Sequence, residues 1–280
     1  MDVVLSDPLA ARAVALIDAG EAAALAVLLA DHPALLSETI DVGPEAAEGG
    51  YFARPRLLWF VAENPIRTGR LPAAIVEVST VIVDAARKAT VPSLQEDLDT
   101  TLGLVASGLV ARETGAQAPL IAHLAAEGAD PNPAMRPALA HREIAAAEAL
   151  VTAGARLDLF AAAGLGQSGT LMSLLSGAEE QALQDALSVA AIAGQAECVR
   201  LLLAAGADPN RFNAPGLHGH TAPIHQAVYS DALETVQALI EGGADPDLPD
   251  RSYGGTALGW AIHNDRPRIA AWLRTRAEYR

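Results

Sequence analysis

The chain has 280 residues, of which 51% are hydrophobic but only 4% aromatic, and it carries a formal net charge of −15. Small apolar residues at this level favour closely packed helices over a β-sandwich. The acidic balance argues against a nucleic-acid partner, because phosphate binding requires a basic face. The single cysteine, Cys198, cannot form an internal disulfide, and we expect a reducing, cytoplasmic setting. Its place on the apolar stripe that leads to Leu201 and Leu202 predicts a buried small hydrophobe.

The first segments of the chain are predicted to be helices. Residues 9–19 follow a Ser-Asp-Pro start, and Gly20 separates them from the helix over 22–30. The apolar run 22–30 is too short to span a bilayer, so we expect no membrane association. Residues 41–55 contain three glycines and two prolines. They predict a connecting loop, with a lid as the alternative.

Further helices follow this loop. Residues 56–63 predict a short inner helix with Trp59 or Phe60 exposed on one side. Residues 71–89 predict a helix that is apolar on nearly every face and is therefore buried between neighbours. The remaining helices are predicted over 93–113, 119–127, 135–140, 143–153, 157–164, 171–176, 185–193, 197–205, 223–229, 233–241, 256–263 and 267–275.

A repeated ending organises the rest of the chain. It reads GADPN at 206–210 and recurs as EGADPN at 127–132, AGARLD at 153–158 and GGADPD at 242–247. In each, a glycine stands where a helix end requires a left-handed residue. A helix pair of this kind cannot bury its apolar stripe alone, so we expect the pairs to stack against one another.

The segment 190–210, AAIAGQAECVRLLLAAGADPN, resembles the second half of an ankyrin repeat. The T-P-L-H turn of that family is matched by TAPIH at 221–225 and by TALG at 256–259. The chain is similar to bacterial ankyrin-repeat proteins clearly over 157–280 and more weakly over 115–156. The resemblance implies an all-α, ankyrin-like solenoid of about eight helix-turn-helix units, with a concave groove and finger loops. Residues 1–115 would be its divergent helical part and residues 116–280 its ankyrin-like repeats.

The resemblance also implies which residues line the groove. The first helix of each unit faces it, and the inner positions are largely apolar. We expect ligand contacts at Trp59, Leu165, Val189, Ile192, Gln226, Tyr229, Trp260 and Asn264. The alternative is that apolar positions such as Val189 and Ile192 only thicken the core. Binding is favoured for Trp260, because an indole N–H requires a partner.

Histidines supply the other candidates. His218 and His220 lie in an enlarged loop, 211–221, that we expect to project as a finger beside the groove. No carboxylate or cysteine at ligand spacing accompanies them, so no metal site is expected. His141 and His263 are expected at groove-facing helix ends. All four are candidate acid/base groups, because imidazole titrates near neutrality.

Three turn residues have expected structural roles. His225 occupies the signature position, where in the related family it bonds backbone groups and holds the turn. Asp231 and Asp265 stand where the turn between helices usually has glycine. We expect them to cap the following helix, with orientation of a groove histidine as the alternative.

Two functions remain open. The first is a binding scaffold that holds a protein or a small hydrophobic molecule in the groove, with an assembly adaptor as a variant of it. The second is a metal- and cofactor-independent lyase, isomerase or cyclase. Such an enzyme would use proton transfer for dehydration, isomerisation or cyclisation of a small hydrophobic substrate. No cofactor is expected in either case, and the oligomeric state is left open.

Overall fold

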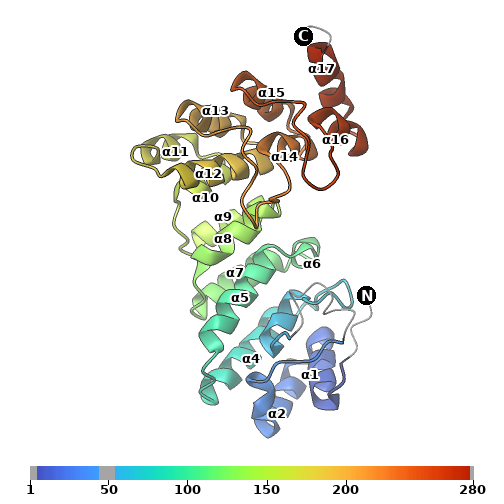
Figure 1. The fold of residues 1–280 in the computed structure, drawn as a ribbon. Coiled ribbons are helices and arrows are strands. Elements are labelled where there is room, and N and C mark those ends of the chain that lie inside the picture. The colour runs from blue at the N-terminus through green and yellow to red at the C-terminus, as the bar shows by residue number, and fades with distance from the viewer. Residues whose placement is uncertain (1–4, 44–53, 278–280) are drawn as a thin grey trace. The chain divides into compact units, whose positions relative to one another are not determined.

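The computed structural model describes residues 5–43 and 54–277, and helices dominate both ranges (Figure 1). Within these ranges no β-strand forms, and one isolated bridge joins Thr39 and Arg56. The predicted all-α class is therefore confirmed. Most of the predicted loop 41–55 lies outside the described residues.

The chain divides into two compact units. The N-terminal unit comprises Met1–Pro137 with Glu148–Ala155, and the C-terminal unit comprises Ala138–Ala147 with Arg156–Arg280. The predicted boundary between residues 115 and 116 rests on the repeat signature and not on compactness, so it stays a prediction.

Capping residues fix both ends of the first helix. Asp7 accepts the N–H of Leu9 at 2.9 Å, Pro8 takes the first helical position, and Gly20 closes the helix in the left-handed region. The helices are α1 (Pro8–Ala19), α2 (Ala22–Asp31), η1 (Pro33–Leu36), η2 (Leu57–Ala62), α4 (Ile75–Lys88), α5 (Leu94–Ala106), α6 (Leu109–Glu113), α7 (Gln117–Ala126), α8 (Pro131–Ala140) and α9 (Ile144–Thr152).

Two predictions for this half were wrong. Helix α4 buries one face, with Val78 and Ile82, against α2 and η2, while Val76 and Val81 remain partly exposed. Its burial on nearly every face is thus not observed. The single helix predicted over 93–113 breaks at Gly108, whose backbone is extended and which starts α6. A side chain there would meet the Leu104 carbonyl oxygen at 2.8 Å.

The C-terminal unit stacks its helix pairs in two rows. Each first helix packs against the first helix of the next pair, and each second helix against the next second helix. The first helices are α10 (Leu159–Gly164), α12 (Glu180–Ile192), α14 (Pro223–Tyr229) and α16 (Ala257–His263). The second helices are α11 (Ser168–Leu174), α13 (Ala196–Ala204), α15 (Leu233–Glu241) and α17 (Pro267–Ala277). Cys198 on α13 is buried as predicted, and burial raises the pKa of its thiol to about 11.

The repeated ending links neighbouring repeats through hydrogen bonds. Asn210 donates from its amide to the carbonyl of Gly243 at 2.9 Å and accepts the N–H of Asp245 at 2.7 Å. Gln184 of α12 donates to the carbonyl of Asp208 and accepts its N–H, which holds the ending that follows α13. Asn210 thus satisfies backbone groups of the next ending, and Gln184 satisfies those of the ending of its own pair.

The turn between the two helices of a pair requires a left-handed residue. Gly194, Asp231 and Asp265 all have positive φ there, and Arg142 takes the same position between α8 and α9. One spacing separates the turn residue from the closing glycine in three pairs: Arg142 and Gly154, Gly194 and Gly206, Asp231 and Gly243. Asp231 does not cap α15 as predicted, because Ala232 occupies that position without a side-chain bond.

Candidate functional site

A pocket of about 590 Å³ opens beside α14 and α16 in the C-terminal unit. Four predicted site residues come together in it: Tyr229, Trp260, His263 and Asn264. Asp250, Tyr253 and Gly255 complete the lining from the loop before α16. Tyr229 belongs to one repeat and the other three predicted residues to the next. Their meeting in one pocket therefore depends on the stacking of the first helices.

Trp260 is the centre of the aromatic contacts in this pocket. Its indole N–H donates to Asp250 Oδ2 at 2.9 Å, so the partner that it requires is a carboxylate of the chain itself and not a ligand. Ring centroids lie 5.5 Å away at His225, 6.3 Å at Tyr229 and 6.4 Å at His220. Trp260 is therefore held from several sides while remaining partly exposed.

Asp250 orders the loop that carries Tyr253. Its Oδ1 accepts the N–H groups of Ser252 and Tyr253 at 2.8 and 2.7 Å, and its Oδ2 accepts that of Gly255 at 2.7 Å. Burial alone would raise the pKa of Asp250, but the bonds from Trp260 and these N–H groups hold the pKa below its usual range. The charged carboxylate thus fixes both the turn and the indole. Asp250 is not among the predicted site residues, although an aspartate followed by Gly254 and Gly255 is a turn signal.

His225 has the structural role predicted for it. Its Nδ1 accepts the N–H of Ala222 at 3.1 Å. Its Nε2 lies 3.1 Å from the carbonyl oxygens of both Leu248 and Gly255. Because carbonyls only accept, Nε2 carries the hydrogen and the ring is neutral. Burial is the main cause that lowers the pKa of His225.

The loop 211–221 does not project as a free finger. Leu217 is fully buried and packs with Ile192 and Ala140. The next residue, His218, donates from Nε2 to the carbonyl of Ala140 at 3.0 Å. The finger prediction is corrected here, because an apolar side chain at the middle of the loop draws it onto the core.

Arg142 is held against α14 by a partly buried polar network. Its Nη2 donates to Gln226 Oε1 at 2.5 Å, and its Nε donates to Ser230 Oγ at 2.8 Å. Gln226 donates in turn to Thr221 Oγ1 at 2.9 Å, and Ser230 donates to the carbonyl of Ile192 at 2.7 Å. Every side chain that fixes Arg142 is therefore itself fixed.

The guanidinium of Arg142 also lies over the ring of Tyr229, 4.5 Å from its centroid. Burial lowers the pKa of Arg142, and Tyr229 acts in the opposite direction. Arg266 donates to the Tyr229 carbonyl at 3.1 Å. Arg142 is not among the predicted site residues. Its place in the turn register, where other pairs have glycine or aspartate, is the signal that marks it.

Several predicted groove residues lie elsewhere. Val189 and Ile192 are fully buried and Gln226 is 2% exposed, so they belong to the core and not to an open groove. Leu165 is half-buried at the end of α10. Trp59 is a half-buried residue of η2 in the N-terminal unit and is not part of this pocket.

The four candidate acid/base histidines are placed differently. His263 lines the pocket and is exposed, and His141 is exposed in the turn after α8. His218 and His220 are half-buried, with ring centroids 6.4 Å apart. Among residues 5–43 and 54–277 no three His, Cys, Asp or Glu side chains gather as a metal site does.

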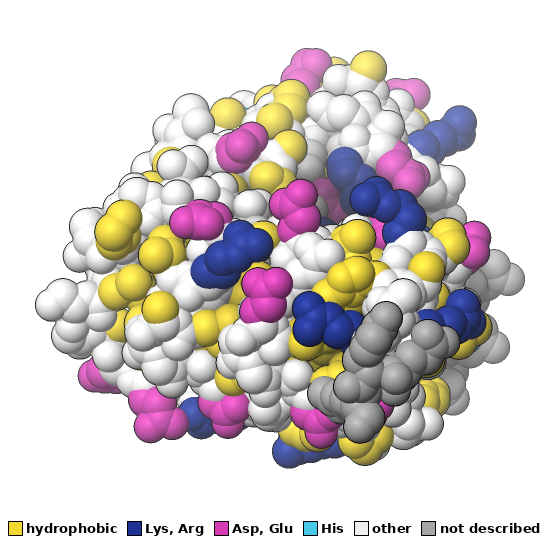
Figure 2. Space-filling model, turned by 90° about the horizontal axis from the view of Figure 1, so that it is seen from above, with side chains coloured by type: hydrophobic (Ala, Val, Ile, Leu, Met, Phe, Trp, Pro, Cys, Tyr) yellow, Lys and Arg dark blue, Asp and Glu magenta, His cyan; other side chains and the backbone are white. Residues whose placement is uncertain are grey.

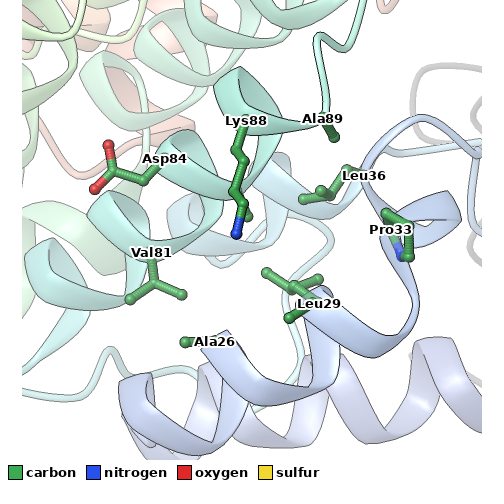
Figure 3. A pocket seen from close by; sticks show the side chains of 10 residues that line it. Ala26, Leu29, Pro33, Leu36, Val81, Asp84, Lys88 and Ala89 are labelled. Carbon is green, nitrogen blue, oxygen red and sulfur yellow. The ribbon is translucent and has the colours of Figure 1, made fainter.

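A second pocket, of about 480 Å³, lies in the N-terminal unit between α2, η1 and α4. Figure 3 shows the Lys88 side chain extending from α4 toward Leu29 and Val81, whereas the Asp84 carboxylate points away. The lining is otherwise apolar, with Leu29, Leu36 and Val81 among its residues. None of the predicted site residues lines this pocket.

Charge is scattered over the surface in view. On the face shown in Figure 2, Asp and Glu side chains stand apart from one another among hydrophobic, Lys and Arg side chains.

Within the part of the chain that the structure describes, no helix has the length and apolar character needed to cross a membrane.

Comparisons with known proteins agree with the stacked helix pairs. The family model described as "Ankyrin repeats (3 copies)" matches residues 159–250. Cyclin-dependent kinase 4 inhibitor B from Bos taurus is 32% identical over 120 residues, which cover 32% of this chain and 91% of the relative. The protein of the same name from Rattus norvegicus is 32% identical over 116 residues, which cover 31% and 88%.

Proposed function

Because this chain belongs to the ankyrin-repeat family, we propose that it is a binding scaffold for a protein partner, with the Trp260 pocket as the contact site. The two relatives are named as inhibitors of cyclin-dependent kinase 4. Inhibition of another protein implies contact with it. That property of the relatives supports a protein partner here.

The observation that carries this proposal is the aromatic surface around the pocket. Trp260, Tyr229 and Tyr253 line one cavity, and tryptophan and tyrosine are the residue types that dominate binding energy at protein interfaces. Tyr229 is 44% exposed and Tyr253 is 88% exposed. Asp250 fixes the indole of Trp260 and the backbone of Tyr253, which lowers the entropic cost of ordering this surface on binding.

A protein partner fits this surface better than a small hydrophobic molecule. The pocket volume is within the range of small-ligand sites, so the small molecule is the alternative. However, Ile262 on α16 is 57% exposed and lies outside the pocket lining. Apolar surface that extends beyond the cavity favours a partner larger than the cavity.

The catalytic alternative has less support. A neutral His218 has only Nδ1 left as a base, since Nε2 carries the hydrogen donated to Ala140. His263 lines the pocket but is exposed, so water reaches it. Acid/base catalysis by the four histidines therefore stays a prediction, as do the bacterial source and the cytoplasmic setting.

The experiment uses random peptides displayed on phage and selected on the full chain. Binding of the selected peptides is then measured with Y253A, whose side chain is too exposed to support the fold. We expect about a tenfold loss of affinity, the effect of removing an interface tyrosine.

The control is M172A on α11, which removes another hydrophobic side chain that is 59% exposed. M172A should leave affinity unchanged. If Y253A and W260A bind the selected peptides as well as the unmodified chain does, the pocket is not the contact site.

A further inference from the structure

Basic side chains gather beside the aromatic pocket in a chain whose net charge is −15. The basic cluster consists of Arg142 and His220. His218 lies beside His220, but its neutral ring donates from Nε2 to the carbonyl of Ala140 and has only a lone pair left at Nδ1. The His218 and His220 rings are 6.4 Å apart, and the His220 ring is 6.4 Å from that of Trp260. Arg142 reaches the same pocket through the ring of Tyr229, whose centroid is 6.3 Å from that of Trp260.

No carboxylate is among the groups that shift the pKa of Arg142 or of His218. Burial is the main cause that lowers the pKa of His218, and the charges of Arg142, His141 and His220 lower it further. The carbonyl of Ala140 acts in the opposite direction. Burial lowers the pKa of Arg142, and the one group that raises this pKa is Tyr229. A partly buried guanidinium without an anionic partner is costly, and such groups mark functional sites.

Arg142 is also pre-oriented as a donor. Its hydrogen bonds to Gln226 and Ser230 use Nη2 and Nε, so Nη1 has no partner among the described residues. A guanidinium has five N–H donors in a rigid fork that matches a carboxylate. The two internal bonds hold the fork in place and leave donors free for a ligand.

We propose that the basic cluster binds an aspartate or glutamate side chain of the partner protein while an apolar side chain of the same partner segment enters the Trp260 pocket. This inference rests on the proposed function, because it assigns the chemistry of the segment held at that site. The adjacent positions of the cluster and the pocket imply that the two side chains are close together on the partner.

A segment with an isolated acidic residue fits better than a strongly acidic one or a nucleic acid. The net charge of −15 repels polyanions as a whole. A single carboxylate, in contrast, is attracted at short range, while more distant charges are screened over about 8 Å at physiological salt. Short-range charge complementarity of this kind contributes more to the specificity of binding than to its affinity.

The test uses peptides selected by display on the full chain and compares each acidic peptide with a copy whose acidic residue is replaced by its amide. With the unmodified chain the amide copy should bind about tenfold more weakly, since it loses charge-assisted hydrogen bonds. With R142Q the two copies should bind about equally, because the charged fork is gone.

Two further variants separate binding from folding. Arg142 supports the turn through Gln226 and Ser230, so thermal melting of R142Q is measured in parallel. H220Q removes a ring for which no hydrogen bond is found among the described residues, and it should reduce the preference for the acidic copy. H32Q is the matched control, because His32 is an exposed histidine of the N-terminal unit. It should leave the preference unchanged.

The outcomes distinguish this inference from the proposed function. If selected peptides depend on Tyr253 but show no acidic preference, or show one that R142Q and H220Q leave intact, the inference fails and the proposed function stands. If the preference depends on Arg142 but binding is independent of Tyr253 and Trp260, the cluster binds acid and the pocket assignment fails. Peptides that depend on both Tyr253 and Arg142 support both.

Discussion

Equivalent positions of two repeats differ in solvent exposure in the C-terminal unit. Val189 and Ile192 on α12 are fully buried, whereas their counterparts Trp260 and His263 on α16 line an open pocket. The two positions differ in whether a loop packs over them. Leu217 of the loop 211–221 packs on Ile192, while Trp260 is bounded on one side by the Asp250 loop and stays partly exposed. The repeat register decides which residues face inward, and the loops decide which of them remain accessible.

The largest effect should come from removing the cover over α12. L217A deletes a fully buried leucine next to Ile192 and should lower the free energy of unfolding by about 2–5 kcal/mol. I262A on the exposed face of α16 is the control and should change it by less than about 0.5 kcal/mol. Urea unfolding measures both, and equal small effects would show that the loop does not cover the core.

A smaller effect is expected at the loop beside α16. D250N replaces one acceptor oxygen by an amide NH2 group. Either the backbone N–H groups of that loop or the indole N–H of Trp260 then lose their acceptor. The expected cost is about 1–3 kcal/mol, with a change in Trp260 fluorescence. D231N serves as control, since Asp231 is exposed and asparagine also tolerates the left-handed region. An unaltered melting curve for D250N would refute the ordering role of Asp250.

The pH dependence of stability should reflect the covered histidines. The folded-state pKa of His225 is lowered from 6.5, so below pH 6.5 the unfolded chain binds more protons than the folded one. The stability contribution is fully present above that value and is lost as pH falls through the folded pKa. Denaturant unfolding at a series of pH values should show this loss. H225Q should flatten that part of the curve, and an unchanged slope would contradict the neutral His225.

The smallest effect is expected at the turn register. D231G places glycine where φ is 54° and where other pairs already have it. Relief of the left-handed backbone should raise the free energy of unfolding by about 0.5 kcal/mol. G194A is the reciprocal change. A side chain there would lie 3.1 Å from Ala232 at a φ of 73°, so thermal melting should show destabilisation. Stabilisation by G194A would contradict the shared register.

Local signals in the sequence predict most of the fold of the C-terminal repeats. The bounds of α14 and α15 match the prediction, because a Thr-to-Pro start and a left-handed glycine end mark that pair. The stacking then brings Tyr229, Trp260, His263 and Asn264 together as expected. Local pattern suffices here because each repeat contacts mainly its neighbours.

The sequence does not reveal which side chains the loops bury, nor the contacts between residues that are far apart in the chain. Arg142 lies 88 residues before Ser230 in the chain, and no spacing rule pairs them. The burial of Ile192 depends on where Leu217 folds back, which no local propensity specifies. Val189 and Ile192 were therefore predicted as groove residues, although their apolar character fits the core equally well.

The central claim is that the pocket around Trp260 binds the partner. The chain has three tryptophans, so an indole-¹⁵N-labelled sample gives three side-chain N–H resonances. On saturation with a display-selected peptide, the Trp260 resonance should shift, while those of Trp59 and Trp272 should stay in place. A peptide that binds and moves Trp59 or Trp272 while leaving Trp260 unchanged would contradict this account.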